Sequence, residues 1–387
     1  MATTNDELAR ARAETAATCD FVLLSSLANV TYVSGFEVPH PLGVTGAVPY
    51  AGSFAAFAVA GEQSVLGVPV SHRAPAERDS RLEGLVTFAT FDSFQPEDPR
   101  ASYLDALQGA LLAAGLGTGA LLGIEGRALP AEASAAIARG FPGVVMVDVG
   151  EALDRARRVK TPREIEKLRG AARVGDAGHR ALAELVALPG RSECELYALV
   201  AARMWEEAGH EISVVGELVT GPRTCTVAYP GGPWPRTTER GDAALMDISQ
   251  RIDGYWSDCT NTRLIGGGAP TPGQRRLVDA AQSAFEAIVG ELRPGRRASD
   301  AWRAAAAVYR TYGVEPPHYG GHQIGALVNE LPRIVPYDDS AIQAGMVFAV
   351  EPGAYEGPGG RFGVRFEKMV LVTASEPEVL SRFDWGL

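Results

Sequence analysis

A strand pair that closes on a two-residue turn constrains the fold of this chain more than any other segment. In the sequence MDISQRIDGYWSD, the dipeptide Asp253-Gly254 is a strong signal for a two-residue β-hairpin turn. Centring the turn there sets Ser249 opposite Asp258, and Asp247 lies two residues away on the same strand as Ser249. Because side chains alternate between the two faces of a strand, the hairpin predicts that both aspartates lie on one face.

Two carboxylates on one face of a strand pair are unusual for a core, because like charges there are destabilising. Taken alone, each aspartate is explained most simply as a solvated residue at a strand end or turn. Further along the chain, His322, Glu351 and Glu367 bring the set to four carboxylates and one imidazole. Neighbouring carboxylates repel one another unless a cation lies among them. The donor set favours Mn, Co, Zn or Fe over a thiolate site, so these residues predict a cage for two divalent metal ions.

The sequence around the three later residues leaves a structural explanation open. His322 lies in HYGGHQIG, four residues after His318, and the glycines favour a loop or strand, where a lone histidine is more often structural. Glu351 follows the apolar run VFAV at the end of a predicted strand. Glu367 is predicted inside a strand, where Arg365 on the same face would be its salt-bridge partner.

Length and composition favour a two-domain globular protein and argue against several partners. A chain of 387 residues with 46% hydrophobic and 21% charged residues is too long for one ordinary core. The net charge of −11 argues against nucleic acid as a partner. The N-terminus is polar and no run reaches ~18 apolar residues, which argues against a signal peptide or a membrane span. Four scattered cysteines without CxxC spacing favour a reducing cytoplasm.

The first part of the chain alternates apolar strands and helices, which predicts an α/β layer domain over residues 1–155. In DFVLLSSLANVTYVSGF we expect two short strands, the second ending at Gly35. Further strands are expected in SFAAFAVAG, SVLGVPV and GALLGIEG, and helices over residues 101–114 and in PAEASAAIARGF.

A helix with a strong start signal marks the beginning of a second domain. Thr161, Pro162 and Glu164 form a capping box with proline at the first helical position, and another helix opens at Ser192. The chain then offers the hairpin over residues 243–248 and 255–265, the helices QSAFEAIVGEL and SDAWRAAAAVYRTYG, and the strands VFAVEPG and GVRFEKMVLVT. This mixture predicts an α+β domain over residues 156–387.

These motifs resemble those of the pita-bread metallopeptidase family of Xaa-Pro aminopeptidases, prolidases, methionine aminopeptidases and creatinase. DISQRIDGYWSDCTNTR resembles the family segment Asp…Tyr-x-Ser-Asp-x-Thr-Arg-Thr, and HYGGHQIG resembles its His-x-x-Gly-His-Gly-Ile-Gly. GMVFAVEPGAY and GVRFEKMVLVT resemble its two glutamate strands. LLSSLANVTYVSGF and RVKTPREIEKLRGAA resemble the start of the creatinase/prolidase N-terminal domain and the entry into the catalytic domain. The resemblance implies the first domain over residues 1–155 and the pita-bread domain over residues 156–387.

The resemblance also implies a role for each of the five residues. Asp258 and Glu367 would bridge two divalent ions. Asp247 would complete the shell of one ion, and His322 with Glu351 that of the other. The identity of the metal stays open among Mn, Co, Zn and Fe.

A reaction and an assembly follow from the same resemblance. It implies a dinuclear-metal-dependent hydrolase that cleaves a C–N amide or peptide bond with a metal-bridging hydroxide, while Glu351 accepts and relays the proton. His318 would support the ligands or contact the substrate, and Arg365 would position the substrate or the carboxylates. A homodimer is expected, in which the N-terminal domain of one chain borders the site of the other.

Two positions depart from the family pattern. The segment NELP, beginning at Asn329, replaces a His-Glu-x-Pro element, and Tyr229 lies where a histidine is expected before the first metal aspartate. Asn329 can donate a hydrogen bond but cannot transfer a proton, and Tyr229 can donate only from its phenol. Both are predicted to bind the substrate, together with the loop over residues 222–236 and with Phe36 and His40.

Three functions therefore remain. The first is an Xaa-Pro dipeptidase or aminopeptidase that acts on small peptides. The second is a family member redirected to a non-peptide small molecule, as a specialised C–N hydrolase or lyase. The third is a binding module without catalysis, and the presence of all five predicted ligands argues against it.

Overall fold

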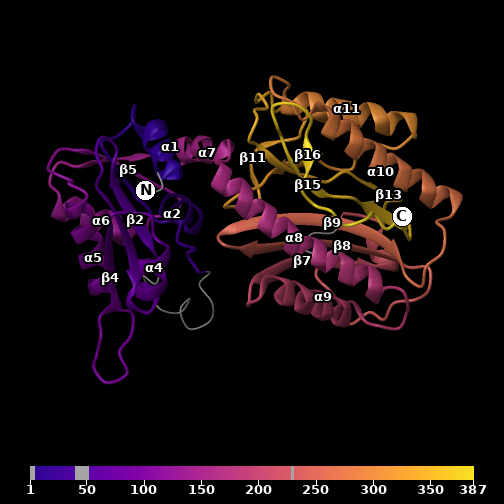
Figure 1. Ribbon diagram of the computed structural model, residues 1–387, viewed down its shortest axis with the longest axis horizontal. Helices are drawn as coiled ribbons and strands as arrows, with labels where there is room; N and C mark the ends of the chain where they lie inside the picture. The colour runs from indigo at the N-terminus through magenta and orange to yellow at the C-terminus, as the bar shows by residue number, and fades with distance from the viewer. Residues whose placement is uncertain (1–4, 40–51, 228–230) are drawn as a thin grey trace. The chain divides into compact units, whose positions relative to one another are not determined.

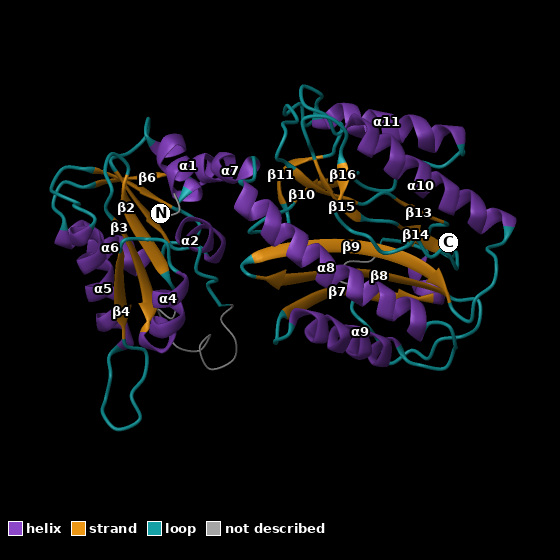
Figure 2. Ribbon diagram, in the orientation of Figure 1, coloured by secondary structure: helices purple, strands orange, loops and turns teal. Residues whose placement is uncertain are grey.

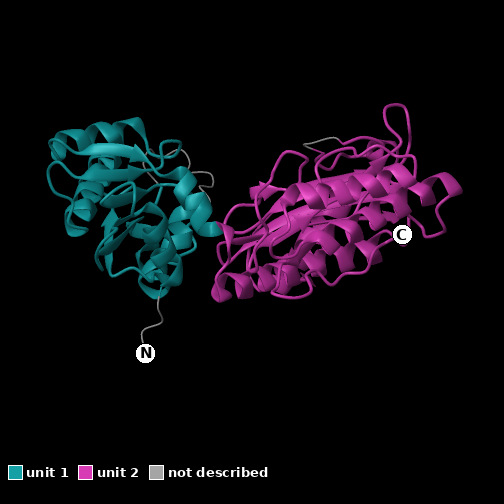
Figure 3. Cartoon of the chain, turned by 90° about the horizontal axis from the view of Figure 1, so that it is seen from above, with its two compact units in different colours: residues 1–157 teal, residues 158–387 magenta. Residues whose placement is uncertain are grey.

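The computed structural model describes residues 5–39, 52–227 and 231–387, so His40 and Tyr229 lie outside the described residues. The chain divides into two compact units, residues 1–157 and 158–387 (Figure 3). Within the described ranges, no helix combines the length and the apolar character needed to cross a membrane.

The first unit is a six-stranded mixed sheet with the strand order β4-β3-β2-β1-β5-β6 (Figures 1 and 2). Side chains of β1 alternate between two apolar clusters: Val22 and Leu24 pack with α1, α2 and α7, and Leu23 packs with α5 and α6. The predicted α/β layer arrangement is therefore confirmed. The strands are β1 Phe21–Leu24, β2 Phe54–Ala58, β3 Ser64–Pro69, β4 Gly84–Phe88, β5 Leu121–Ile124 and β6 Val145–Asp148. The helices are α1 Asp6–Thr15, α2 Leu27–Ser34, η1 Val70–His72, α4 Arg73–Asp79, α5 Pro99–Ala113, α6 Ala131–Gly140 and α7 Gly150–Arg158.

The second strand predicted in DFVLLSSLANVTYVSGF is wrong, because α2 takes its place. The Ser26 side chain accepts a hydrogen bond from Asn29 N and caps the helix. Gly35 ends it in the left-handed conformation at φ 74° and donates to Thr31 O. The β-branched run around Thr31 favours a strand locally, and the two caps outweigh that preference.

A buried carboxylate fills the end of this sheet where α/β folds commonly bind ligands. Glu125 follows β5 and accepts hydrogen bonds from Ser25 N at 2.7 Å, Ser26 N at 2.9 Å and Asn29 Nδ2 at 2.6 Å. It thus occupies the N-terminus of α2, the position at which a helix would otherwise bind an anion.

The second unit holds a three-stranded sheet, β7-β8-β9, and a five-stranded sheet, β11-β10-β12-β15-β16, with the pair β13-β14 (Figure 2). Helices α8 and α9 pack with β7 and β8, and α10 and α11 pack with β12 and β15. The strands are β7 Ser213–Thr220, β8 Ala243–Ile252, β9 Tyr255–Leu264, β10 Gly321–Gln323, β11 Glu330–Arg333, β12 Val347–Val350, β13 Gly353–Tyr355, β14 Gly363–Arg365, β15 Lys368–Leu371 and β16 Glu378–Val379. The helices are α8 Pro162–Leu185, α9 Glu193–Ala208, η2 Gly221–Thr224, α10 Pro272–Glu291 and α11 Ala298–Thr311.

The β8–β9 hairpin has the register predicted from its turn. Ser249 pairs with Asp258, and Asp253 and Gly254 have φ of 51° and 84°, as a primed turn requires. Met246 and Ile248 of β8 belong to the cluster formed with α8 and α9. Because side chains alternate, the two aspartates face away from those helices.

The strand predicted through Glu367 is interrupted. β14 ends at Arg365 and β15 begins at Lys368, so Glu367 lies in the gap between them. Its backbone N donates to Thr260 O of β9 at 2.9 Å. The segment GVRFEKMVLVT has strand-like composition throughout, but the chain passes from one sheet to another here. This break brings the Glu367 side chain beside the hairpin that holds the two aspartates.

His179 of α8 makes the fold sensitive to acid. The imidazole is fully buried, lies against Phe383 with ring centroids 4.1 Å apart, and its Nε2 is 3.1 Å from Cys259 O. Burial lowers the pKa of His179 to about 3. A pKa depressed on folding means that stability is lost as pH falls through the unfolded value of about 6.5 toward the folded one.

We therefore expect His179→Phe to flatten the acid side of the stability curve. The free energy of unfolding of the parent should fall by about 2 kcal/mol more than that of the variant between pH 7 and pH 5. Urea unfolding at the two pH values measures this difference. The same substitution at exposed His210 is the matched control, and parallel curves for parent and His179→Phe would contradict the prediction.

Candidate metal centre

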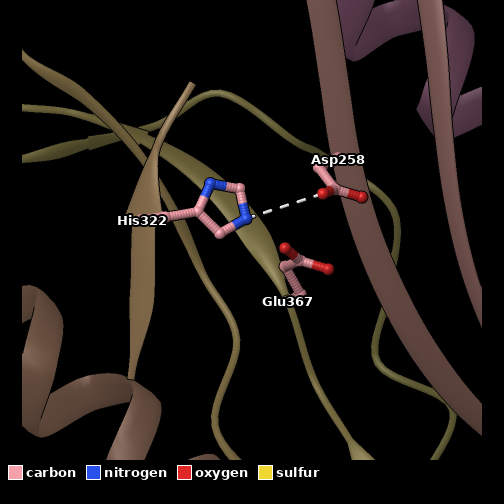
Figure 4. Close-up of side chains that lie close together, drawn as sticks. All are labelled: Asp258, His322 and Glu367. Atoms are coloured by element: carbon pink, nitrogen blue, oxygen red, sulfur yellow. Dashed lines mark ion pairs between the residues drawn. The ribbon is translucent and has the colours of Figure 1, made fainter. Parts of the chain in front are cut away.

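Three buried side chains converge between the two sheets of the second unit. Asp258 comes from β9, His322 from β10 and Glu367 from the gap between β14 and β15. Each offers one ligand atom, and these atoms all lie within 4.8 Å of one another (Figure 4). His322 Nε2 is 3.6 Å from Asp258 Oδ2, as the dashed line in Figure 4 shows. The sequence therefore identified residues that the fold does bring together.

The other two predicted ligands flank this group. Glu351 directly follows β12, and its Oε1 lies 3.3 Å from His322 Nε2. Asp247 lies on β8, and its Oδ2 accepts a hydrogen bond from Arg365 Nη2 at 2.6 Å. The charges of Glu351 and Asp247 both contribute to raising the pKa of Glu367, which places them within electrostatic range of it.

The state of Glu367 fits a divalent cation. One carboxylate oxygen accepts a hydrogen bond from Thr260 Oγ1 at 2.6 Å, whereas Oε1 is buried without a partner among the described residues. Burial first, and then the charges of neighbouring carboxylates, raise the pKa of Glu367 well above its ordinary value. Burial does the same for Asp247, although Arg365 opposes it. A buried, unpartnered carboxylate oxygen among other ligand atoms is satisfied by a bound metal ion.

The imidazole of His322 is oriented by its own neighbour in the chain. Its Nδ1 lies 2.9 Å from Gln323 O, and because a carbonyl only accepts, Nδ1 donates and Nε2 faces the carboxylates. Burial would lower the pKa of His322, but hydrogen bonds to Asp258 and Glu351 outweigh it and raise the pKa to about 10. A metal ligand must be the neutral imidazole, so metal binding would displace this proton.

Arg365 forms a buried network beside the ligands. Its Nη2 donates to Asp247 Oδ2 at 2.6 Å and to Glu217 Oε2 at 2.7 Å, and its Nη1 donates to the Tyr355 hydroxyl at 3.2 Å. Burial would lower its pKa, but Tyr355 and the carboxylates keep it well above the ordinary value. A salt bridge with Glu367 was the alternative explanation of that residue, but among the described residues Arg365 pairs with Asp247 and Glu217 instead, because the chain leaves β14 immediately after Arg365.

Sequence reasoning missed Glu217 and Tyr355. Glu217 is the acidic residue of the largely apolar strand SVVGELVT. A charge in a strand of this kind is the sequence signal that could have pointed to a paired, functional carboxylate. Tyr355 lies four residues after Glu351, and its hydroxyl is 3.4 Å from His318 Nε2. His318 Nδ1 donates to Tyr319 O at 2.8 Å, and burial lowers the pKa of His318, so it is a neutral hydrogen-bond acceptor toward Tyr355.

The predicted substrate residues have mixed outcomes. Asn329 is exposed, and its Oδ1 accepts from Arg333 Nε at 3.0 Å. Phe36 is only 3% exposed and belongs to an apolar cluster of the first unit, and its part in the substrate pocket stays a prediction. Tyr229 and His40 lie outside the described residues.

The described residues in and after η2 are held by hydrogen bonds, an ion pair and a cation–π contact. Glu193, buried at the start of α9, accepts from Trp234 N at 2.8 Å and from the guanidinium of Arg223. That guanidinium lies 4.0 Å from the Trp234 ring centroid. Gly231 N donates to Glu217 Oε1 at 3.3 Å. Glu217 thus connects the loop to Arg365 and Asp247.

Family models match both units. The model of metallopeptidase family M24 matches residues 166–374, and the creatinase/prolidase N-terminal domain model matches residues 8–159. The chain belongs to metallopeptidase family M24. The resemblance drawn from the motifs is confirmed, as is the fold class of an α/β creatinase/prolidase-like domain followed by an α+β pita-bread domain.

Two relatives and one solved structure that are similar to this chain carry the names of dipeptidases or a prolidase. The probable dipeptidase PepE of Mycobacterium tuberculosis is 35% identical over 238 residues, which make up 60% of this chain and 60% of that protein. The Xaa-Pro dipeptidase of Pyrococcus horikoshii is 25% identical over 366 residues, 94% of this chain and 93% of that protein. The crystal structure of the P. horikoshii OT3 prolidase superposes with a TM-score of 0.77 at 25% identity, over 99% of this chain and 100% of that one. This chain therefore spans about 60% of the length of the mycobacterial dipeptidase.

Proposed function

We propose that this protein is a dinuclear-metal-dependent hydrolase, similar to Xaa-Pro dipeptidases, that cleaves a C–N bond of a small peptide. The observation that supports it most is the convergence of Asp258, His322 and Glu367 within 4.8 Å, with a buried Glu367 oxygen that lacks a hydrogen-bond partner. The dipeptidase names of M24 relatives support a peptide as the substrate.

The five residues would hold two divalent ions. Asp258 and Glu367 would be shared between the ions, Asp247 would bind one, and His322 and Glu351 the other. Oxygen donors with one imidazole suit Mn, Co, Zn or Fe. When bound, such a pair of ions supplies a water that is acidic enough to lose its proton near neutral pH, and it polarises the scissile carbonyl.

The remaining chemistry belongs to side chains. Glu351, beside His322, would accept a proton from the attacking water and pass it to the leaving amine. Arg365 would hold Asp247 through one carboxylate oxygen, Oδ2, so that the other faces the ions. His318, held neutral by burial, would accept hydrogen bonds from the substrate side of the site through Nε2, with Tyr355 as its partner at rest.

Asn329 bears on the rate of this reaction, and we expect Asn329→His to raise kcat. An exposed amide paired with Arg333 cannot transfer a proton, whereas an imidazole can do so near neutral pH. The expected gain on an Xaa-Pro dipeptide is about tenfold in kcat. Steady-state kinetics of the Mn²⁺-loaded variant measures it, with Asn329→Gln as the matched control. A variant no faster than the parent would place Asn329 outside the reaction.

Assays on peptides test the proposal. The protein loaded in turn with Mn²⁺, Co²⁺ and Zn²⁺ should hydrolyse Xaa-Pro dipeptides. Turnover of none of them with any of the three metals would contradict the peptidase function. If a non-peptide amide is cleaved instead, the redirected small-molecule function takes its place. The assembly is proposed to be a homodimer, for which sedimentation equilibrium should give twice the 40.8 kDa mass of the chain.

A further inference from the structure

Lys160, which precedes α8, places its ammonium group inside the second unit. The side chain is 0% exposed, and Nζ donates to Gln323 Oε1 at 2.5 Å and to Glu330 Oε2 at 3.1 Å. Burying an ammonium is costly unless it is paired and hydrogen-bonded. Because the Lys160 ammonium lies between these two acceptors and is bonded to both, it holds them in a defined position.

Both acceptors lie on the strand pair that holds His322. Gln323 directly follows His322 on β10, and Glu330 pairs with Gln323 across to β11. The register of this pair shifts between His322, which pairs with Arg333, and Gln323. A bulge disrupts the ladder of backbone hydrogen bonds, so side-chain contacts must fix the strands relative to each other at this point.

The placement of Gln323 decides the orientation of the proposed ligand. His322 Nδ1 donates to Gln323 O, and that bond turns Nε2 toward Asp258 and Glu351. The Gln323 Nε2 atom is buried without a partner among the described residues, whereas Gln323 Oε1 accepts a hydrogen bond from Lys160. A shift of the β10 backbone at Gln323 would move this carbonyl oxygen and rotate the imidazole away from the other ligands.

Glu330 fixes the turn that connects the two strands. Its Oε1 accepts from Leu327 N at 3.2 Å while Oε2 accepts from Lys160. A Cβ at Gly325 would lie 2.8 Å from the Glu330 carboxylate, so only glycine leaves room for it. One carboxylate thus joins the β10–β11 turn to the segment before α8.

The lysine itself is held by its backbone. Lys160 N donates to Gly345 O at 2.9 Å, in the turn before β12, and Glu351 directly follows that strand. Thr161, the next residue, is the N-cap of α8. Lys160 is thereby connected to the strand that leads to Glu351 and to the strand of His322.

We infer that Lys160 is a positioning residue for the metal centre, which orients His322 through Gln323 and Glu330. This inference rests on the proposed function, since it assumes that His322 binds a metal ion. Mutating a group that orients a metal ligand typically lowers metal affinity by about 10- to 100-fold. Lys160→Met should therefore weaken Mn²⁺ binding by about 10- to 100-fold, as measured by isothermal titration calorimetry.

A comparison of affinity with stability separates positioning from a structural role. Lys160→Met removes the buried ion pair between Lys160 and Glu330 and should lower the melting temperature of the metal-free protein. The double variant Lys160→Met/Glu330→Gln should recover much of the melting temperature while Mn²⁺ affinity stays weak. Arg169→Met, which breaks the ion pair with Glu378 elsewhere in the same unit, is the control and should leave Mn²⁺ affinity unchanged.

A second variant covers the case in which Lys160→Met does not fold. Gln323→Met keeps the Lys160–Glu330 pair and the backbone carbonyl bonded to His322, but it removes the side-chain oxygen that accepts from Lys160, and it should weaken Mn²⁺ binding to a similar extent. Affinities within twofold of the parent, or affinity that returns together with the melting temperature in the double variant, would overturn the inference. If the parent itself binds no Mn²⁺, the proposed function fails and the inference falls with it, whereas Mn²⁺ binding without peptide turnover contradicts the proposed function alone.

Discussion

Replacing Glu367 by glutamine is expected to have opposite effects on stability and activity. The parent holds a buried carboxylate whose pKa is raised by burial and by neighbouring carboxylates, so its ionised form destabilises the metal-free fold. Glutamine removes that charge and should make the metal-free protein more stable at neutral pH. The same substitution removes a proposed shared ligand and should lower kcat/KM by about 1,000-fold, or about 4 kcal/mol in the transition state.

The sign of the pH dependence follows from the direction of the shift. A carboxyl group whose pKa is raised on folding contributes stability below its unfolded pKa of about 4.3, and this is lost as pH rises through the folded pKa. The stability gain of Glu367→Gln should therefore grow with increasing pH. Urea unfolding with EDTA at pH 5 and pH 8 measures it, and exposed Glu376→Gln is the control. A metal-free variant less stable than the parent at pH 8 would contradict this account of the site.

Replacing Arg365 by methionine should destabilise the protein strongly. The guanidinium is bonded to the buried Glu217 and to the partly exposed Asp247, so its loss removes the cation shared by these two carboxylates. Removing one partner of a buried ion pair typically costs about 3–5 kcal/mol. Activity should also fall, because Asp247 loses the contact that orients it.

A second substitution tests the cause of this destabilisation. The double variant Arg365→Met/Glu217→Gln also removes the charge of Glu217, one of the two carboxylates that lose their cation. Its free energy of unfolding should therefore recover part of the loss, while kcat/KM stays low. Urea unfolding and steady-state kinetics of the single and double variants measure both quantities. A loss below about 1 kcal/mol in Arg365→Met would show that water or another group already compensates the carboxylates.

Local sequence signals predicted the elements on which the site is built. The Asp253-Gly254 turn determined the register of β8 and β9, and with it the shared face of Asp247 and Asp258. The capping box at Thr161 and Glu164 located the start of α8. These features depend on residues close together in the chain, so sequence alone suffices for them.

The errors have two causes: local helix caps that were given too little weight, and contacts between residues that are far apart in the chain. The segment before Gly35 contains β-branched residues and yet forms α2, because caps at both ends and packing against the sheet stabilise a helix. Glu367 lies in a break between strands because it bonds to Thr260 of β9, 107 residues away. Glu217 could not be assigned to the site from sequence, since its partner Arg365 is 148 residues away.

The metal content of the chain tests the central claim most directly. After reconstitution with Mn²⁺ and removal of unbound metal, elemental analysis of the parent should give two ions per chain, and Asp258→Asn should reduce that number below one. Two ions would support the shared-ligand arrangement of Asp258 and Glu367 with Asp247, His322 and Glu351. Fewer than one ion per chain in the parent would contradict it.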